Sequence, residues 1–357
     1  MTFGDLILLI PFLKELRQCY PDACISLVCG GRGSAVCRRY PWIDEVINLA
    51  ELKTWRGAIG IFGQLARLMR SDRVFALYPF FSAALIAFLL AGRKRLGFAQ
   101  ARTQLYVGRR GFTSHPSVST LKNWIIRNVL LTNAVEMQID ERHASTRFNQ
   151  VLGYDLASSD TLRGALRDVY PPNKSDIGRR IILAPFSGWQ PKNWPIERWV
   201  RLGERLVLMD RQLEILVCCE LDSKPAVENA FGHIAQVKAF CPGQDFDLFF
   251  RTFAMASLLV SNDSFPLHVG SALNVPSVGI FGPTLPKWFG SLAEPSVNLF
   301  QVIECNPCLQ KRGTEPCLKG LKTCAAISTL TVDRVAEECL TLLGPTSLAA
   351  SGPKLQS

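Results

Sequence analysis

The densest group of residues with the potential for chemistry follows an apolar run at residues 258–260. Asp263 and Ser264 come directly after that run, and His268 stands four residues further on. A polar residue followed by Pro266 is a helix-start signal, so the pattern predicts a strand, a turn and a helix. Helix N-termini attract anions because their first N–H groups lack backbone partners. The alternative is that Asp263 or Ser264 only caps the helix and that His268 belongs to the core.

A second apolar run at residues 275–281 predicts a buried parallel strand, and Gly282, Pro283 and Thr284 turn the chain at its carboxyl end. Ligands of open α/β sheets bind beyond the carboxyl ends of strands. The two turns are therefore candidates for one binding site.

These segments resemble the donor-site signature of the heptosyltransferase family, glycosyltransferase family 9, whose bacterial GT-B enzymes use ADP-heptose. The resemblance implies that Asp263, Ser264 and His268 bind the donor and that Gly282 to Thr284 close its adenosine pocket. The residues that carry it are Asn262-Asp263-Ser264, His268, Ala272-Leu273-Asn274-Val275-Pro276 and Phe281-Gly282-Pro283-Thr284. The family usually has Gly after the Asp-Ser pair, whereas this chain has Phe265. Phe265 favours a rival interpretation, a transferase of the same fold with another nucleotide-sugar or acceptor.

A second similarity lies at the start of the chain, where Gly4-Asp5, a hydrophobic run and Pro11 resemble the family's amino-terminal motif. The resemblance implies that Asp5 is the base that takes the proton from the acceptor hydroxyl. Such a base must stand on the sugar face opposite the leaving diphosphate. The alternative is that Asp5 only caps a helix. The family has an apolar strand before Gly-Asp, so we expect either that the true start lies upstream of Met1 or that the first strand of the N-terminal sheet is missing. That expectation leaves a catalytically impaired binding or scaffold protein as another rival.

A third similarity begins at the predicted strand 180–185 and continues to Lys192-Asn193-Trp194-Pro195 and a helix at 196–209. It resembles the entry to the family's second domain and implies that Ser187 and Lys192 bind the donor, with Lys192 on its diphosphate. An ammonium group and a helix N-terminus together neutralise a leaving ADP without a metal. The alternative is an ordinary surface lysine.

An acidic turn follows the predicted strand at residues 213–218, at Glu220 and Asp222. The family carries a Gly pair here and an acid that contacts the adenosine ribose, so the resemblance implies that Glu220 or Asp222 does so. The alternative is a solvated acid at a strand end.

Four cysteines form a C-x2-C-x8-C-x6-C pattern, which by spacing alone is compatible with a structural zinc site. They are Cys305, Cys308, Cys317 and Cys324. A disulfide and free thiols are the alternatives, and free thiols are favoured because cytoplasmic chains rarely keep disulfides. We expect no catalytic metal and no cofactor.

A chain of 357 residues suits two domains, and strands that alternate with helices predict the α/β class. With the resemblance, the expected fold is GT-B, two Rossmann-like doubly wound domains that face a cleft. Helices are predicted at 6–16, 120–131 and 145–152 among others. The expected divisions are an acceptor-binding domain at 1–167, a linker at 168–178, a donor-binding domain at 179–343 and a disordered tail at 344–357.

The net charge of +10 is spread along the chain, and basic residues are not interleaved with aromatic ones as in single-strand binders. We therefore expect no nucleic-acid partner. The longest apolar runs fall short of the roughly 20 residues that span a bilayer. No spanning helix is therefore predicted. Cysteines within or beside apolar runs indicate reduced, buried thiols and a cytoplasmic protein. The resemblance implies a peripheral position on the inner face of the cytoplasmic membrane, which suits a basic chain. The resemblance implies an inverting transfer of heptose from ADP-heptose to the lipopolysaccharide inner core.

Overall fold

The computed structural model divides into two compact units, one of residues 1–2 with 9–158 and the other of residues 3–8 with 159–357. It describes residues 3–31, 33–69, 71–77, 81–90, 94–99, 131, 133–136, 144–146, 162–172, 179–308, 317 and 319–344. The predicted domain boundaries stay a prediction. Most residues of the helices predicted at 120–131 and 145–152, part of the linker and nearly all of the tail lie outside the described residues.

The larger unit is built on a parallel six-stranded sheet with the order β11-β10-β9-β6-β7-β8. From β6 the chain proceeds outward to β8, crosses to the other side of β6 to form β9, and proceeds outward to β11. The order therefore reverses between β6 and β9, the kind of switch point where open α/β sheets bind ligands. The strands are β6 (Arg180–Ala184), β7 (Glu214–Cys218), β8 (Val237–Phe240), β9 (Leu258–Asn262), β10 (Ser277–Phe281) and β11 (Ser296–Phe300).

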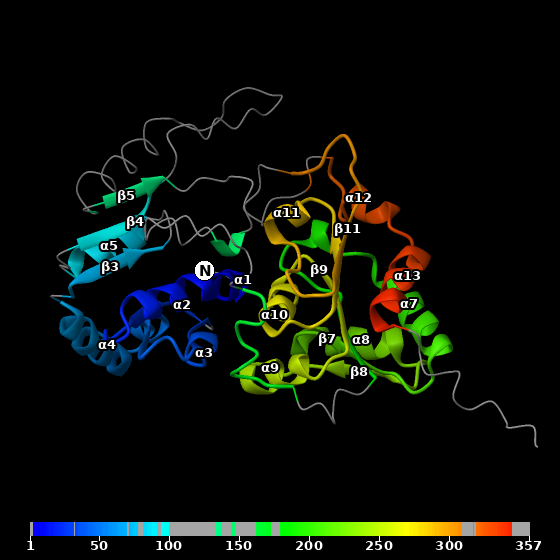
Figure 1. The fold of residues 1–357 in the computed structure, drawn as a ribbon, viewed down its shortest axis with the longest axis horizontal. Coiled ribbons are helices and arrows are strands. Elements are labelled where there is room, and N and C mark those ends of the chain that lie inside the picture. Colours follow the sequence, from blue (N-terminus) through cyan, green and yellow to red (C-terminus); the bar gives the residue numbers. More distant parts are fainter. Residues whose placement is uncertain are drawn as a thin grey trace, which may run out of the picture. The chain divides into compact units, whose positions relative to one another are not determined.

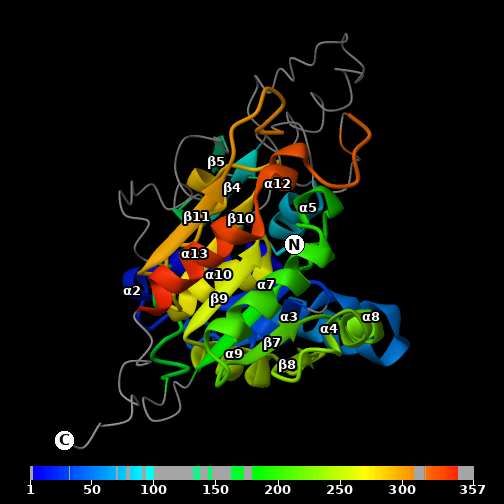
Figure 2. The same ribbon diagram turned by 90° about the vertical axis from the view of Figure 1, so that its right-hand side faces the viewer.

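Helices cover both faces of this sheet, with α7 and α13 on one side and α9 and α10 on the other (Figures 1 and 2). Helix α7 has the bounds that the sequence predicts. The helical elements of this unit are η5 (Gln190–Lys192), α7 (Ile196–Met209), η6 (Leu221–Ser223), α8 (Lys224–Phe231), α9 (Phe246–Ala254), α10 (Phe265–Leu273), α11 (Pro286–Phe289), α12 (Ala325–Thr329) and α13 (Val332–Leu343).

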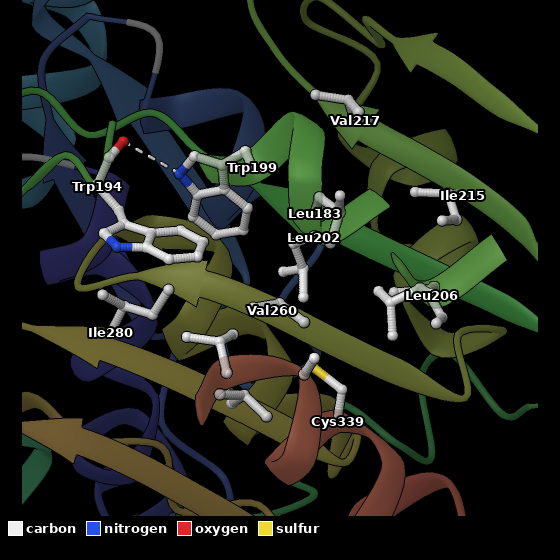
Figure 3. Packing of buried hydrophobic residues seen from close by; sticks show 14 of the residues in the cluster. Leu183, Trp194, Trp199, Leu202, Leu206, Ile215, Val217, Val260, Ile280 and Cys339 are labelled. Carbon is white, nitrogen blue, oxygen red and sulfur yellow. Dashed lines mark hydrogen bonds between the residues drawn. The ribbon is translucent and has the colours of Figure 1, made fainter. Parts of the chain in front are cut away.

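Two tryptophans anchor the start of α7 in the core on the α7 face of the sheet (Figure 3). Trp194 and Trp199 are fully buried with ring centroids 5.4 Å apart. The indole N–H of Trp199 donates to the carbonyl of Trp194 (3.2 Å), and that of Trp194 donates to the carbonyl of Leu330 (3.1 Å). Because both indole N–H groups donate hydrogen bonds, the buried rings leave no indole donor unpaired. They fix the backbone that follows Lys192.

In its described residues, the smaller unit has two parallel sheets, β1-β2 and β3-β4-β5. Strands and helices alternate along it, which confirms the predicted α/β class. Its elements are α2 (Ile10–Cys19), β1 (Ser26–Cys29), α3 (Gly33–Cys37), β2 (Glu45–Asn48), η1 (Leu49–Lys53), α4 (Trp55–Leu68), β3 (Arg73–Ala76), α5 (Phe81–Leu89), β4 (Lys94–Ala99) and β5 (Asn133–Glu136). Among the helices of the described ranges, none is long and apolar enough to cross a membrane.

The single opening helix predicted over residues 6–16 is wrong, because the structure has two helices there. Helix α1 (Phe3–Leu8) ends before Leu9, and α2 begins at Ile10 with Pro11 in its first turn. Pro11 has no N–H to donate to the carbonyl four residues earlier, so the helical ladder stops in front of it. Helix α1 groups with the larger unit, where it packs against α10.

Candidate functional site

The site is centred on an ion pair at the switch point of the six-stranded sheet. Lys192 lies at the end of η5, in the loop that follows β6, and Asp263 lies directly after β9. The Lys192 Nζ is 2.5 Å from the Asp263 Oδ2. The side chains are 20% and 3% exposed, so solvent screens the pair only weakly. The structure thus brings together two of the predicted donor-binding residues.

Thr284, also predicted, completes the surroundings of the same carboxylate from the turn after β10. Its hydroxyl donates to the Asp263 Oδ2 over 2.5 Å. Gly282 in that turn has no room for a side chain, because a Cβ would lie 2.5 Å from the Ile327 side chain. The Pro283 carbonyl accepts a hydrogen bond from the Cys308 N–H (2.6 Å). The predicted turn of residues 282–284 therefore positions one side of the site.

Two asparagines that the sequence reasoning did not assign to the site tie its loops together. Asn262 is fully buried. Its side-chain amide donates to the Pro185 carbonyl (2.6 Å), and its Oδ1 accepts from the Trp194 N–H (3.2 Å). The Asn193 Oδ1 lies 2.8 Å from both the N–H and the hydroxyl of Ser187. Ser187, predicted to bind the donor, is thus also bonded within its own loop.

Helix α10 points its N-terminus toward the turn that carries Asp263. Its N-cap residue, Ser264, makes no side-chain capping bond, and its hydroxyl donates instead to the Asn262 carbonyl (3.3 Å). Pro266 in the first turn has no N–H to satisfy. An uncapped helix N-terminus with a lysine beside it is suited to hold an anion.

His268 lies one turn into α10 and is only 4% exposed. Its Nδ1 has no hydrogen-bond partner within the part of the chain that the structure describes. Burial lowers the pKa of His268 to about 4; Asp263 and Asp5 oppose this shift, and Lys192 adds to it. The imidazole is therefore neutral at pH 7, with a buried nitrogen open to a ligand. An unpaired buried polar group costs about 1–3 kcal/mol.

Phe289 of α11 is a further residue that the sequence reasoning missed. Its ring centroid lies 5.7 Å from the Lys192 Nζ and 6.4 Å from the His268 ring. The aromatic face attracts the ammonium group. No motif marked this residue, because its role follows from the placement of a four-residue helix.

Asp5 stands in the first turn of α1, within the same compact unit as Lys192. Its charge acts on His268. Phe265, where the family usually has Gly, packs in an aromatic group that holds this helix. The Phe265 ring lies 5.5 Å from that of Phe3 and 5.2 Å from that of Phe249. Phe265 therefore contributes to the placement of Asp5.

Glu220 and Asp222 are exposed residues of the turn after β7, at the same edge of the sheet. The described contacts do not join their side chains to Lys192 or Asp263. Their predicted contact with a ribose stays a prediction.

The four cysteines of the C-x2-C-x8-C-x6-C pattern are free thiols. Burial raises the pKa of the Cys324 thiol, and the thiols of Cys305 and Cys317 raise it further. No three His, Cys, Asp or Glu residues in the described ranges are grouped closely enough to hold a metal ion. Residues 309–316 and 318 lie outside those ranges.

Comparisons with known proteins identify the family of this chain. The model of "Glycosyltransferase family 9 (heptosyltransferase)" matches residues 63–319. Lipooligosaccharide heptosyltransferase 2 of Campylobacter jejuni is 30% identical over 340 residues, 89% of this chain and 91% of that protein. Lipopolysaccharide heptosyltransferase 1 of Pseudomonas aeruginosa is 27% identical over 168 residues, so the match spans 46% of that relative.

The solved structure of E. coli ADP-heptose lipopolysaccharide heptosyltransferase II aligns with a TM-score of 0.67 at 18% identity, over 96% of both chains. At 18% identity the structural similarity is evidence for the fold alone, and it confirms the predicted GT-B class. Lys192, Asp263 and Thr284 lie within the family match, whereas Asp5 precedes it.

His268 should make stability depend on pH in a defined window. The unfolded chain takes up this proton near pH 6.5, but the folded protein does so only near pH 4. Between these values the unfolded state binds more protons, so the free energy of unfolding falls as the pH drops, on the order of 3 kcal/mol in all. His268→Gln should lose that much less between pH 7 and pH 4 in urea titrations. Parallel pH dependences for the two proteins would contradict the assignment.

Phe265→Ala should loosen α1 without unfolding the larger unit. The variant removes three aromatic contacts, with Phe3, Phe246 and Phe249, of about 0.5–1.5 kcal/mol each, so amide exchange of residues 3–8 should be roughly tenfold faster. Phe240→Ala is the matched control, because its ring also lies against Phe249 (6.4 Å) but sits on β8. If both variants accelerate exchange of residues 3–8 equally, Phe265 has no special role in holding the helix.

Proposed function

The chain belongs to glycosyltransferase family 9, and from this premise we propose that it is an inverting, metal-independent heptosyltransferase. It transfers a heptose from ADP-heptose to the inner core of lipopolysaccharide. The observation that carries the proposal is the Lys192–Asp263 ion pair beside the N-terminus of α10.

The diphosphate of the donor binds where these positive groups gather. Lys192 supplies one full charge, and α10 adds a partial charge of about one half at its N-terminus. When the bond between the sugar carbon and the diphosphate breaks, the leaving oxygen gains negative charge. A preorganised ammonium group in a poorly screened site stabilises that charge more than water does. Lys192 is therefore the residue that assists departure.

Asp263 has two tasks in this proposal. Its Oδ2 is engaged by Lys192 and Thr284, which holds the ammonium group at the start of α10 before the donor arrives. The carboxylate also orients sugar hydroxyls. His268 is neutral at pH 7 and offers its unpaired Nδ1 to an atom of the donor.

Asp5 acts as the base. It accepts the proton of the acceptor hydroxyl while that oxygen attacks the sugar carbon and the diphosphate leaves from the opposite face. The reaction is a single displacement, which inverts the configuration at that carbon. Support for this role comes from the placement of α1 against α10, since it brings the Asp5 charge close enough to act on His268.

The setting is the cytoplasmic face of the inner membrane, where the acceptor is a lipid-linked saccharide. The basic balance of the chain favours such an anionic surface. Support for ADP-heptose as the donor comes from the name of the E. coli structure.

Lys192→Ala should lower the turnover number for ADP-heptose by about 10²–10³-fold, because one preorganised charge is removed from the leaving group. The measurement is ADP release with a lipopolysaccharide-core acceptor. Lys238→Ala is the matched control, since this lysine is 67% exposed and pairs with Glu214 on the surface. Unchanged turnover in the Lys192 variant would remove that residue from the mechanism.

Asp5→Asn should abolish transfer while leaving donor binding intact. The amide keeps the size of the side chain but cannot accept the proton. ADP-heptose should still raise the melting temperature of the variant, as it does for the wild type, and a UDP-sugar should raise neither. Full transfer by the variant would exclude Asp5 as the base. A shift with the UDP-sugar alone would instead favour another donor.

A further inference from the structure

Helix α4 carries two apolar faces, of which only one is covered. The inner face is formed by Ala58, Ile61, Leu65 and Leu68, at spacings of three and four residues, and Ile61 is 1% exposed. Such a stripe is the usual core-facing side of a surface helix.

The second stripe is displaced by one residue, which turns it by about 100° around the helix axis. It consists of Ile59, Phe62, Ala66 and Met69, and we call it the outer face of α4. Ile59 is 57% exposed, Phe62 66% and Met69 51%. Several large apolar side chains on one exposed face mark an interaction surface, because single exposed apolar residues are common but aligned ones are not.

Basic residues surround the outer face. Arg67 on α4 is 70% exposed. Lys53 is exposed at the end of η1, which packs against α4. The nearby acids are already paired: Glu45 with Arg67 (3.1 Å), and Glu51 with Arg38 (3.6 Å). The surface is thus apolar along its centre and basic at its border.

This combination selects the kind of partner. A helix with an apolar face and flanking arginines lies in the plane of a membrane interface, with its apolar side chains at the boundary between headgroups and acyl chains. Basic side chains beside it then reach the anionic headgroups. A second copy of this chain is a poorer occupant, because two molecules of charge +10 repel each other.

We propose that the outer face of α4 docks the protein onto an anionic lipid bilayer. Ile59, Phe62 and Met69 enter the interface, and Arg67 and Lys53 contact the headgroups. The inference rests on the proposed function for its biological setting, since the acceptor there is a membrane lipid. Membrane docking itself requires neither donor nor acceptor and is measured without them.

The test is co-sedimentation of the purified full-length chain with sucrose-loaded vesicles, either of phosphatidylcholine alone or of equal parts phosphatidylcholine and phosphatidylglycerol. The wild type should bind the mixed vesicles, with binding weakened by salt, and should not bind phosphatidylcholine alone. Phe62→Ser and Ile59→Ser should each reduce the partition coefficient by about tenfold, because each removes an apolar anchor from the interface. Arg67→Gln should reduce it less and should flatten the salt dependence.

Leu208→Ser is the matched control, because Leu208 is 76% exposed on α7 of the other unit. It should bind vesicles like the wild type, and the Phe62 variant should keep the wild-type melting temperature. Lys192→Ala should also bind fully, so a failed transfer mechanism and a failed docking surface give different results. The proposal is overturned if the wild type does not bind, if Phe62→Ser binds equally well or if Leu208→Ser loses as much. It is also overturned if gel filtration shows a dimer that Phe62→Ser dissociates.

Discussion

The ion pair between Lys192 and Asp263 is the constraint around which the larger unit is arranged. Burying two charges costs more than their attraction returns unless hydrogen bonds complete both partners. Asp263 receives one such bond from Thr284. The pair therefore depends on three chain segments that arrive at one place, after β6, β9 and β10. Only the reversal of strand order between β6 and β9 puts the first two side by side.

Hydrogen bonds from Asn306, Cys308 and Cys324 support these segments. The Cys324 N–H donates to the Pro191 carbonyl (3.1 Å), next to Lys192. The Cys308 N–H donates to the Pro283 carbonyl, and the Asn306 side chain donates to the Gly282 carbonyl (3.0 Å). The cysteine-bearing loop thus fixes both the lysine turn and the threonine turn. This position agrees with the burial of Asn306 and Cys324.

The sequence revealed the parts of the site that depend on residue type at short range. Lys192, Asp263 and Thr284 each follow a recognisable strand and turn. The structural role of Asn262 was not predicted, because its hydrogen-bond partners, Pro185 and Trp194, are 77 and 68 residues away in sequence. Pro11 indicates a helix start near residue 10, but the helical spacing of apolar residues continues across it and predicted one uninterrupted helix. The outer face of α4 could not be predicted either. Helix α4 has two apolar stripes with the same period, and periodicity alone does not show which of them faces the core.

Phe265 shows how one departure from a family pattern acquires a physical meaning. A glycine after the Asp-Ser pair would leave space beside the helix start, whereas the ring of Phe265 fills it and meets Phe3 and Phe249. The same contact binds α1 to α10, so Asp5 and Lys192 belong to one compact unit. Their mutual distance then does not depend on how the two units are placed. The charges of Asp5 and Lys192 both act on His268, and burial keeps its imidazole neutral. The positive charge of the site therefore rests on Lys192 and the α10 N-terminus, while the imidazole is left to serve as a neutral hydrogen-bonding group.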